Sequence, residues 1–386
     1  MRRIGRTFIV GGGCIALLCS SIILISCERK PQEIRIGLIV YTDDEVERSS
    51  TLNAASLAVD DINNGKGLTV QGQKRQIVIV REDVPSDVPE KSVEAVQKLI
   101  NQRDVVAIVG PQFSSDAIPA GQIAETSRIP LISPISTNPK TTLNRKFVFR
   151  MGFNDDHQGC VAASFLTNDL GLVKLAVLYN VTNPYSRGIA DVFRECVLKS
   201  ETGKIVAFES YTSGDADLTL QLTRIRDAGP QAVYLPNISR EAESIVVQVR
   251  KVGIRSVLMG GDGWDRTRFS KMPQFEGSYM TAHYSEMMDT PENETFVRMY
   301  TRRFGVVPGD TAALTYDAFR MVLHAMELGN SANPVTIRDT LYTMGPFNGV
   351  GGSINFTDTG DPTKGTVILQ FHKGEVMRLR GGVELR

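Results

Sequence analysis

Short β-rich runs alternate with amphipathic helices along most of this chain, and no other feature of the sequence limits the fold as strongly. Strands that are joined by helices are typical of an α/β protein whose sheet is mainly parallel. Nine runs have the composition of strands: IRIGLIV (34–40), QIVIVRE (76–82), VVAIVG (105–110), PLIS (130–133), KLAVLY (174–179), KIVAFES (204–210), AVYLP (232–236), SVLMG (256–260) and SYMTAH (278–283). We therefore expect an α/β fold.

The same pattern divides the chain into two series. The segments between the strands carry apolar residues at a spacing near 3.6, which indicates helices. One βα series ends at about residue 150, and a second runs from about 155 to 280. Residues 291–345 are then chiefly helical, and 346–386 contain strands punctuated by glycine. No period of 20 to 50 residues recurs, so two similar lobes are expected rather than a solenoid.

The first 26 residues have the layout of a secretory signal peptide, with basic residues before an apolar stretch. The sequence Leu24-Ile25-Ser26-Cys27 resembles a bacterial lipobox, which implies cleavage before Cys27 and lipid on its thiol and new amino terminus. A plain membrane anchor with a chance cysteine is the alternative. Polar residues follow Cys27, so 27–33 are expected to form a tether, and stable anchoring needs more than one acyl chain. We expect an exported, lipid-anchored protein.

Charge and cysteine content are ordinary once the signal is removed. The remainder has 40 basic and 43 acidic residues, a net charge of −3, which gives no reason to expect nucleic acid as a partner. Cys160 and Cys196 remain in an oxidising compartment, where a bridge is possible. Both fall in predicted helices with apolar neighbours. Two buried free thiols are expected, although the sequence leaves a disulfide open.

Residue patterns of enzymes and metal sites are missing from the sequence. The four histidines are scattered, without an H-E-x-x-H motif or a cysteine pair, and no serine stands in G-x-S-x-G. No phosphate-binding G-x-x-x-x-G-K occurs either. We therefore expect no catalytic residue, no cofactor and no metal.

One stretch, VVAIVGPQFSSDAIPA (105–120), places two serines where a strand ends and a helix begins. Serine oxygens at this position commonly cap the helix by accepting its free N–H groups. A helix mouth with hydroxyls beside it can also bind an anion. The residues alone leave both roles open for Ser114 and Ser115.

Eight pieces of the chain together resemble the type I periplasmic binding proteins of the branched-chain amino acid branch, the substrate-capturing subunits of ABC importers. The resemblance covers about residues 34 to 380 and rests on the order and spacing of the pieces. These are DDINNGKGL (60–68), VVAIVGPQFSS (105–115), IPLISPISTNP (129–139), FVFRMGFNDDHQG (147–159), KLAVLYNVTNPYSRG (174–188), DADLTLQLTRIRDAGPQAVYLP (215–236), VLMGGDGW (257–264) and LTYDAFRMVLHA (314–325).

The resemblance implies two Rossmann-like lobes that are joined by three crossovers, with a ligand cleft between them. The crossovers are expected near 150–154, 281–285 and 365–370. Lobe one would combine residues 34–150 with 285–365, and lobe two would combine 151–284 with 366–386. Such a protein, expected to be monomeric, captures an amino acid or related small zwitterion and presents it to ABC permease subunits.

In this family, two loops of the first lobe hold the carboxylate of the amino acid by hydroxyls and backbone N–H groups. By position, Ser114 takes the serine role and Thr137 the threonine role, while Ile135 and Ser136 offer backbone groups. Ser115 belongs to the same site. Helix capping remains the alternative for Ser115 and Thr137.

The second lobe of the family supplies an acid for the ligand ammonium, and Asp262 falls at that position. The alternative is an aspartate in a glycine-flanked turn. Tyr185 matches a tyrosine that lines the cleft. Trp264 is a candidate wall or lid for the ligand side chain, with a core tryptophan as the alternative. Asn237 completes the predicted site.

Two loops depart from the family pattern. Residues 41–50 (YTDDEVERSS) hold four acids, and the loop 237–241 (NISRE) carries Asn237 and Arg240 where leucine-type binders have aromatics. Most of the four acids are expected to be solvated surface charge. Since both loops border the pocket for the ligand side chain, a polar or cationic amino acid or amide is expected rather than a branched aliphatic one.

Two other functions remain open. A receptor module that reports ligand occupancy to a signalling partner would use the same cleft and differ only in its partner. A cleft enzyme of the amidase type would have to consume its ligand.

Overall fold

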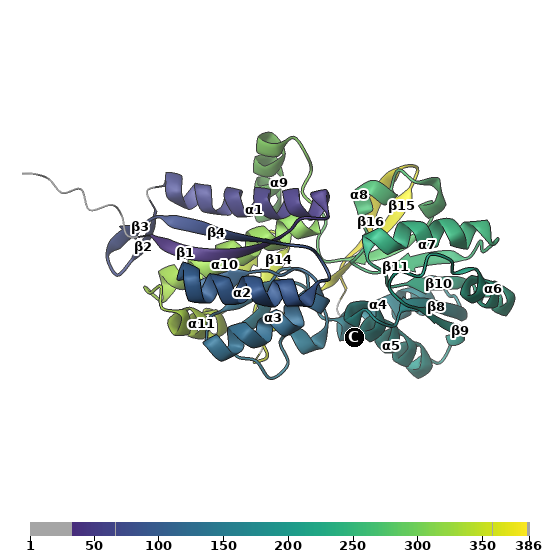
Figure 1. Ribbon diagram of the computed structural model, residues 1–386. Helices are drawn as coiled ribbons and strands as arrows, with labels where there is room; N and C mark the ends of the chain where they lie inside the picture. Colours follow the sequence, from purple (N-terminus) through teal and green to yellow (C-terminus); the bar gives the residue numbers. More distant parts are fainter. Residues whose placement is uncertain (1–32, 66, 357, 384–386) are drawn as a thin grey trace, which may run out of the picture.

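The computed structural model describes residues 33–65, 67–356 and 358–383, so the predicted signal and Cys27 lie outside the described part. Two α/β lobes lie side by side, joined by short chain segments between them (Figure 1). The predicted fold class is confirmed.

The first lobe is built on a parallel sheet of five strands with helices on both faces. In spatial order the strands are β4 (Ile77–Val84), β1 (Ile34–Tyr41), β5 (Ala107–Val109), β6 (Leu131–Ser133) and β7 (Val148–Arg150). One face packs on α1 (Glu45–Asn64), α9 (Pro291–Phe304), α10 (Asp310–Leu328) and α11 (Pro334–Thr343), and the other on α2 (Pro89–Arg103) and α3 (Ser114–Ser127). Two hairpins complete the lobe: β2 (Leu68–Val70) with β3 (Gln73–Arg75), and β13 (Phe347–Gly349) with β14 (Gly352–Ile354).

Strand β1 shows why this sheet is covered on both faces. Successive side chains of a strand point to opposite faces. Ile36 and Leu38 belong to the core beneath α1 and α10, whereas Ile39 and Tyr41 belong to the core beneath α2 and α3. The near-continuous apolar run of this strand is therefore the signature of a parallel sheet between two helical layers.

The second lobe has a sheet of seven strands: five pair in parallel, and the two strands nearest the C-terminus join the edge of the sheet through antiparallel pairing. In spatial order they are β16 (Glu375–Val383), β15 (Thr366–His372), β12 (Tyr279–Ala282), β11 (Val257–Gly260), β10 (Ala232–Leu235), β8 (Lys174–Asn180) and β9 (Lys204–Tyr211). Its helices are α4 (Asp155–Ser164), which continues as η2 (Phe165–Asp169), α5 (Pro184–Lys199), α6 (Thr219–Ala228), α7 (Ser239–Lys251) and α8 (Arg266–Phe269). Short 3-10 turns occur in both lobes, as η1 (Pro139–Thr141) and η3 (Pro273–Phe275).

Three segments cross between the lobes. Residues 151–154 connect β7 to α4, residues 283–290 connect β12 to α9, and residues 355–365 connect β14 to β15. The first lobe is thus interrupted in sequence by most of the second. The exact residue at which one lobe becomes the other stays a prediction.

A disulfide joins Cys160 in α4 to Cys196 in α5, so the expectation of two free thiols was wrong. The two helices pack side by side in the second lobe, and the Cα atoms of the cysteines are 5.3 Å apart. This distance lies within the range that a disulfide requires. Apolar neighbours in two separate helices could not reveal that the helices meet at these positions.

Candidate ligand-binding site

A pocket lies between the two lobes, beyond the carboxyl ends of the parallel strands, which is where open α/β sheets bind ligands. Its empty volume is about 340 Å³, including the part that is open to solvent. The first lobe lines it with Asp87, Gln112, Phe113, Ser114, Ser115, Ile135, Ser136 and Thr137, and the second with Asn183, Tyr185, Ile238, Asp262 and Gly263. All five site residues predicted in the first lobe, and two of the four predicted in the second, therefore meet here. Their part in binding stays a prediction.

Ser114 does not cap its helix. The cap position of α3 is Phe113, and no side chain makes a capping hydrogen bond there. Ser114 Oγ instead lies 3.0 Å from Ser136 Oγ and accepts a hydrogen bond of 3.3 Å from the Asn138 backbone N–H. Ser114 therefore ties together the two polar loops of the first lobe. Hydroxyls gathered at a helix mouth in this way are suited to a carboxylate.

Ser115 contacts an acid that the sequence analysis did not single out. Its hydroxyl donates to the carboxylate of Asp87, which also lines the pocket. The backbone N–H of Asp87 donates to Asp116 Oδ2 at 3.0 Å, and the Tyr41 hydroxyl donates to the same oxygen at 2.7 Å. Asp87 has a φ of 53°, a left-handed conformation that aspartate tolerates better than most residues. The first turn of α3 thus holds Asp87 at the pocket.

Asp116 makes the stability of the protein depend on pH. Burial raises its pKa to about 6; the nearby charge of Asp87 adds to this rise, and the hydrogen bond from Tyr41 opposes it. A raised pKa means that the folded state holds the proton more tightly, so stability falls as pH rises from about 4 to 6. A shift of about 2 units corresponds to about 3 kcal/mol.

Between pH 4 and pH 7, we expect the free energy of unfolding of Asp116→Asn to fall by about 3 kcal/mol less than that of the wild type, because the amide does not ionise. Urea unfolding at pH 4, 5, 6 and 7 measures the difference. The exposed Asp104→Asn is the matched control and should follow the wild-type profile. Parallel profiles for Asp116→Asn and the wild type would contradict the assignment.

Arg150 is fully buried and supports the loop that contains Ser136. Its guanidinium donates to the carbonyl oxygens of Ser136 (3.1 Å) and Asn138 (3.0 Å). It also donates to Thr142 Oγ1 (2.8 Å) and forms an ion pair of 2.6 Å with Asp361. Loop carbonyls in the first lobe are therefore fixed by one side chain from the end of β7. An arginine between apolar residues in FVFRMGF was a signal that sequence reasoning passed over.

Asp262 lies in the loop after β11 and is held by three donors of the second lobe. Oδ1 accepts from Gln158 Nε2 (2.6 Å) and from the Tyr185 hydroxyl (2.9 Å), while Oδ2 lies 2.9 Å from His283 Nε2. The side chain of Asp262 is 3% exposed. Gln158 and His283 were not predicted as part of the site, because they come from α4 and from a crossover.

These contacts leave Asp262 ionised and with room for one more donor. Burial on its own would raise the pKa of Asp262, but the neighbouring His283 and the hydrogen bonds from His283, Gln158 and Tyr185 bring it below its usual value. A carboxylate offers about four lone-pair positions. Two are used on Oδ1 and one on Oδ2, so Oδ2 can accept a further N–H from a ligand in the pocket.

Two predicted site residues do not line this pocket. Trp264 is buried in the aromatic core of the second lobe, with its ring centroid 5.1 Å from that of Phe275. Asn237 is buried too, and its amide donates to the Tyr211 hydroxyl at 2.7 Å, while the next residue, Ile238, lines the pocket. Both residues lie in the short connection between β10 and α7, where a difference of one position separates a residue that faces its own lobe from one that lines the pocket.

The acids of the loop 41–50 also lie outside the pocket lining. Asp44 caps α1 by accepting from the Val46 and Glu47 N–H groups, and Asp43 accepts from the backbone and side chain of Ser86. Glu47 accepts from Thr311 Oγ1 at 2.8 Å. The expectation of a cationic ligand rested on these acids and loses that support.

In the described part of the chain, no group of three or more His, Cys, Asp or Glu side chains is placed to hold a metal ion. Nor does any helix in the same residues combine the length and apolar character that crossing a bilayer requires.

Two similar α/β lobes with a pocket between them are the architecture of bilobal solute-binding proteins. A sequence profile described as "Periplasmic binding protein" matches residues 33–375, and the chain belongs to this family. It is therefore a binding protein of an exported class and not an enzyme.

Named relatives agree with the predicted branch of the family. "Leu/Ile/Val-binding protein homolog 1" of Brucella suis biovar 1 is 27% identical over 345 residues, which are 88% of this chain and 90% of that protein. "Amino acid binding protein" of Pseudomonas aeruginosa is 29% identical over 311 residues, covering 80% of this chain and 81% of that one. The predicted resemblance is confirmed.

Solved structures give the same result. The leucine binding protein LivK of Thermotoga maritima has a TM-score of 0.83 and 28% identity, covering 90% of this chain and 98% of its own. LivJ of Streptococcus pneumoniae, solved in complex with isoleucine, has a TM-score of 0.80 and 27% identity, covering 90% of this chain and all of its own.

Proposed function

We propose that this protein captures a free α-amino acid between its lobes and presents it to an ABC importer. The observation that carries the proposal is the division of the pocket into two chemically different halves. The first lobe contributes the hydroxyls of Ser114, Ser136 and Thr137, which suit a carboxylate, and the second contributes the ionised Asp262, which suits an ammonium. A ligand that contacts both halves stabilises the closed arrangement of the lobes.

The walls of the pocket favour an uncharged side chain on this amino acid. Phe113, Ile135 and Ile238 provide apolar surface in the same pocket. Relatives named for leucine, isoleucine and valine, and LivJ with its isoleucine, support the same ligand class. This proposal replaces the polar or cationic ligand that the sequence alone suggested.

The cellular setting follows from the family and from the amino terminus. A lipid anchor on Cys27, with residues 27–33 as a tether, would hold a monomeric binding protein at the membrane, where ABC permease subunits receive the ligand. The number of acyl chains matters here, since a single chain holds a protein only weakly.

Thermal unfolding of the full-length chain in detergent tests the proposal with leucine and two truncated analogues. Leucine at about 100 times its Kd should add about 2.7 kcal/mol of stability. 4-Methylpentanoate lacks the amino group and isoamylamine lacks the carboxylate, so each engages one half of the pocket and should give no measurable shift at the same concentration. Equal shifts with all three, or no shift with any of the twenty amino acids, would contradict the proposal. Release of ammonia from leucinamide would point to an enzyme instead.

A further inference from the structure

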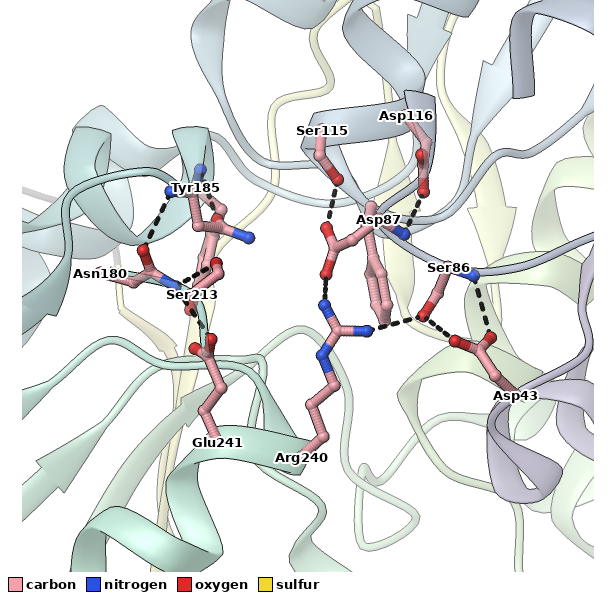
Figure 2. Close-up of polar contacts among 12 residues, drawn as sticks. Asp43, Ser86, Asp87, Ser115, Asp116, Asn180, Tyr185, Ser213, Arg240 and Glu241 are labelled. Carbon is pink, nitrogen blue, oxygen red and sulfur yellow. Dashed lines mark hydrogen bonds and ion pairs between the residues drawn. The ribbon is translucent and has the colours of Figure 1, made fainter. Parts of the chain in front are cut away.

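Arg240 reaches from the second lobe to Asp87, a residue of the first lobe that lines the pocket. It stands in the first turn of α7 and forms an ion pair with Asp87, which follows β4 in the first lobe. It also donates to Ser86 Oγ at 3.2 Å. Figure 2 shows the guanidinium between these two residues, beneath the first turn of α3. The contact exists only while the lobes are together.

The first lobe holds its half of this contact rigidly. Asp43 accepts from Ser86 through both the backbone N–H and the hydroxyl, each at 2.9 Å. Asp87 is fixed on two sides, by Ser115 and by Asp116 (Figure 2). The Asp87 side chain is 12% exposed, whereas that of Arg240 is 48% exposed. The acid is thus held in place as part of the pocket, and the arginine is the more exposed partner.

Helix stability does not explain an arginine at this position. The N-terminal turn of a helix carries partial positive charge and favours acids over bases. Glu241, in the same turn, meets that preference and binds Tyr211 and Asn180 within its own lobe. Arg240 pairs with Asp87 of the other lobe, so its role concerns the cleft.

The charges around the pocket give this pair a consequence for ligand choice. Among the described residues that line the pocket, Asp87 and Asp262 carry carboxylates and none carries a positive charge. Asp262 has a free lone pair for the ligand ammonium, whereas Asp87 is already neutralised by Arg240. A zwitterion with a neutral side chain leaves this balance intact, whereas a second ammonium placed beside Asp87 would also stand beside the guanidinium that already pairs with it.

We propose that the Arg240–Asp87 pair is the specificity determinant that rejects amino acids with cationic side chains, and that Asp87 without Arg240 would accept them. The inference rests on the proposed function. A cationic side chain beside Arg240 would be rejected because like charges placed together inside an interface are costly. The selectivity is thus assigned to one long side chain of the second lobe.

Norleucine and lysine test the inference, because they have the same six-carbon chain and lysine adds an ammonium group at its end. Isothermal titration calorimetry with the full-length chain gives the ratio of the two dissociation constants. We expect the wild type to bind norleucine about tenfold or more tighter than lysine. Arg240→Gln leaves the Asp87 carboxylate without its ion-pair partner at the pocket. In this variant, the affinity for lysine should rise about tenfold or more relative to the affinity for norleucine.

Two further variants decide whether Asp87 is responsible. Arg240→Gln combined with Asp87→Asn should cancel the gain for lysine, since no charge then remains to attract it. Arg224→Gln removes an exposed arginine that pairs with Glu209 inside the second lobe, and should keep the wild-type ratio. Circular dichroism confirms that each variant is folded.

The outcomes separate the inference from the proposed function. Two outcomes overturn the inference and leave the proposed function standing. In the first, norleucine binds tightly and Arg240→Gln does not change the ratio of the norleucine and lysine dissociation constants. In the second, the wild type prefers lysine. A wild type that binds no amino acid overturns both.

Discussion

Replacing Arg150 by methionine lowers the free energy of unfolding by about 3–5 kcal/mol, because removing one partner of a buried ion pair leaves the other uncompensated. Methionine retains most of the apolar volume but none of the donors. Asp361 loses its ion-pair partner, and the carbonyls of Ser136 and Asn138 each lose the hydrogen bond from the guanidinium. Chemical unfolding of variant and wild type in parallel measures the change.

A matched control for this variant is Arg81→Met in the same lobe. Arg81 pairs with Asp83 at the surface, where ion pairs contribute about 0–1 kcal/mol. The two substitutions are identical in chemistry and differ in burial. Equal losses of stability in Arg150→Met and Arg81→Met would refute the supporting role of Arg150.

Asp262→Asn weakens amino acid binding by about 2–5 kcal/mol, or roughly 30- to 4000-fold in Kd, because it removes the charge that faces the ligand ammonium. The amide keeps an oxygen for Gln158 and Tyr185, and its NH₂ can face His283 Nε2 in the accepting tautomer. Alanine would instead strand three donors, so asparagine separates binding from folding. Calorimetry with leucine measures the loss.

Asp265→Asn controls for the change of an acid to an amide in the same loop. Asp265 caps α8 by accepting from the Arg268 N–H at 3.0 Å, and it does not line the pocket. Its variant should bind leucine as the wild type does, with a somewhat lower melting temperature. Unchanged affinity in Asp262→Asn would remove Asp262 from the site.

Most strands of the two large sheets could be predicted, because a strand is marked by an apolar run in its own local sequence. Continuous apolar runs such as IRIGLIV are required wherever helices cover both faces of a strand, so composition alone marks β1. The loops after β5 and β6 could be predicted for the same reason, since they follow directly from strands that were recognised. Thr137 lies in the second of these loops, and Ser114 begins the helix that follows the first.

Contacts between distant segments could not be predicted from the residues. Arg240 and Asp87 are 153 positions apart, and Arg150 and Asp361 are 211 apart. No local pattern links such residues. Errors of one position matter as well, since Asn237 faces its own lobe and Ile238 faces the pocket.

The interruption of the first lobe has a consequence for how the chain matures. Phe296, Phe319 and Leu341, from α9, α10 and α11, complete the core that begins with β1. About 140 residues separate the end of β7 from α9, so a ribosome working at roughly 5–20 residues per second needs about 7–28 s to reach the first of these three helices. Until then α1 is the only helix available for this apolar face among those that cover it in the described structure. The core of the first lobe is therefore completed only after most of the second lobe has been synthesised.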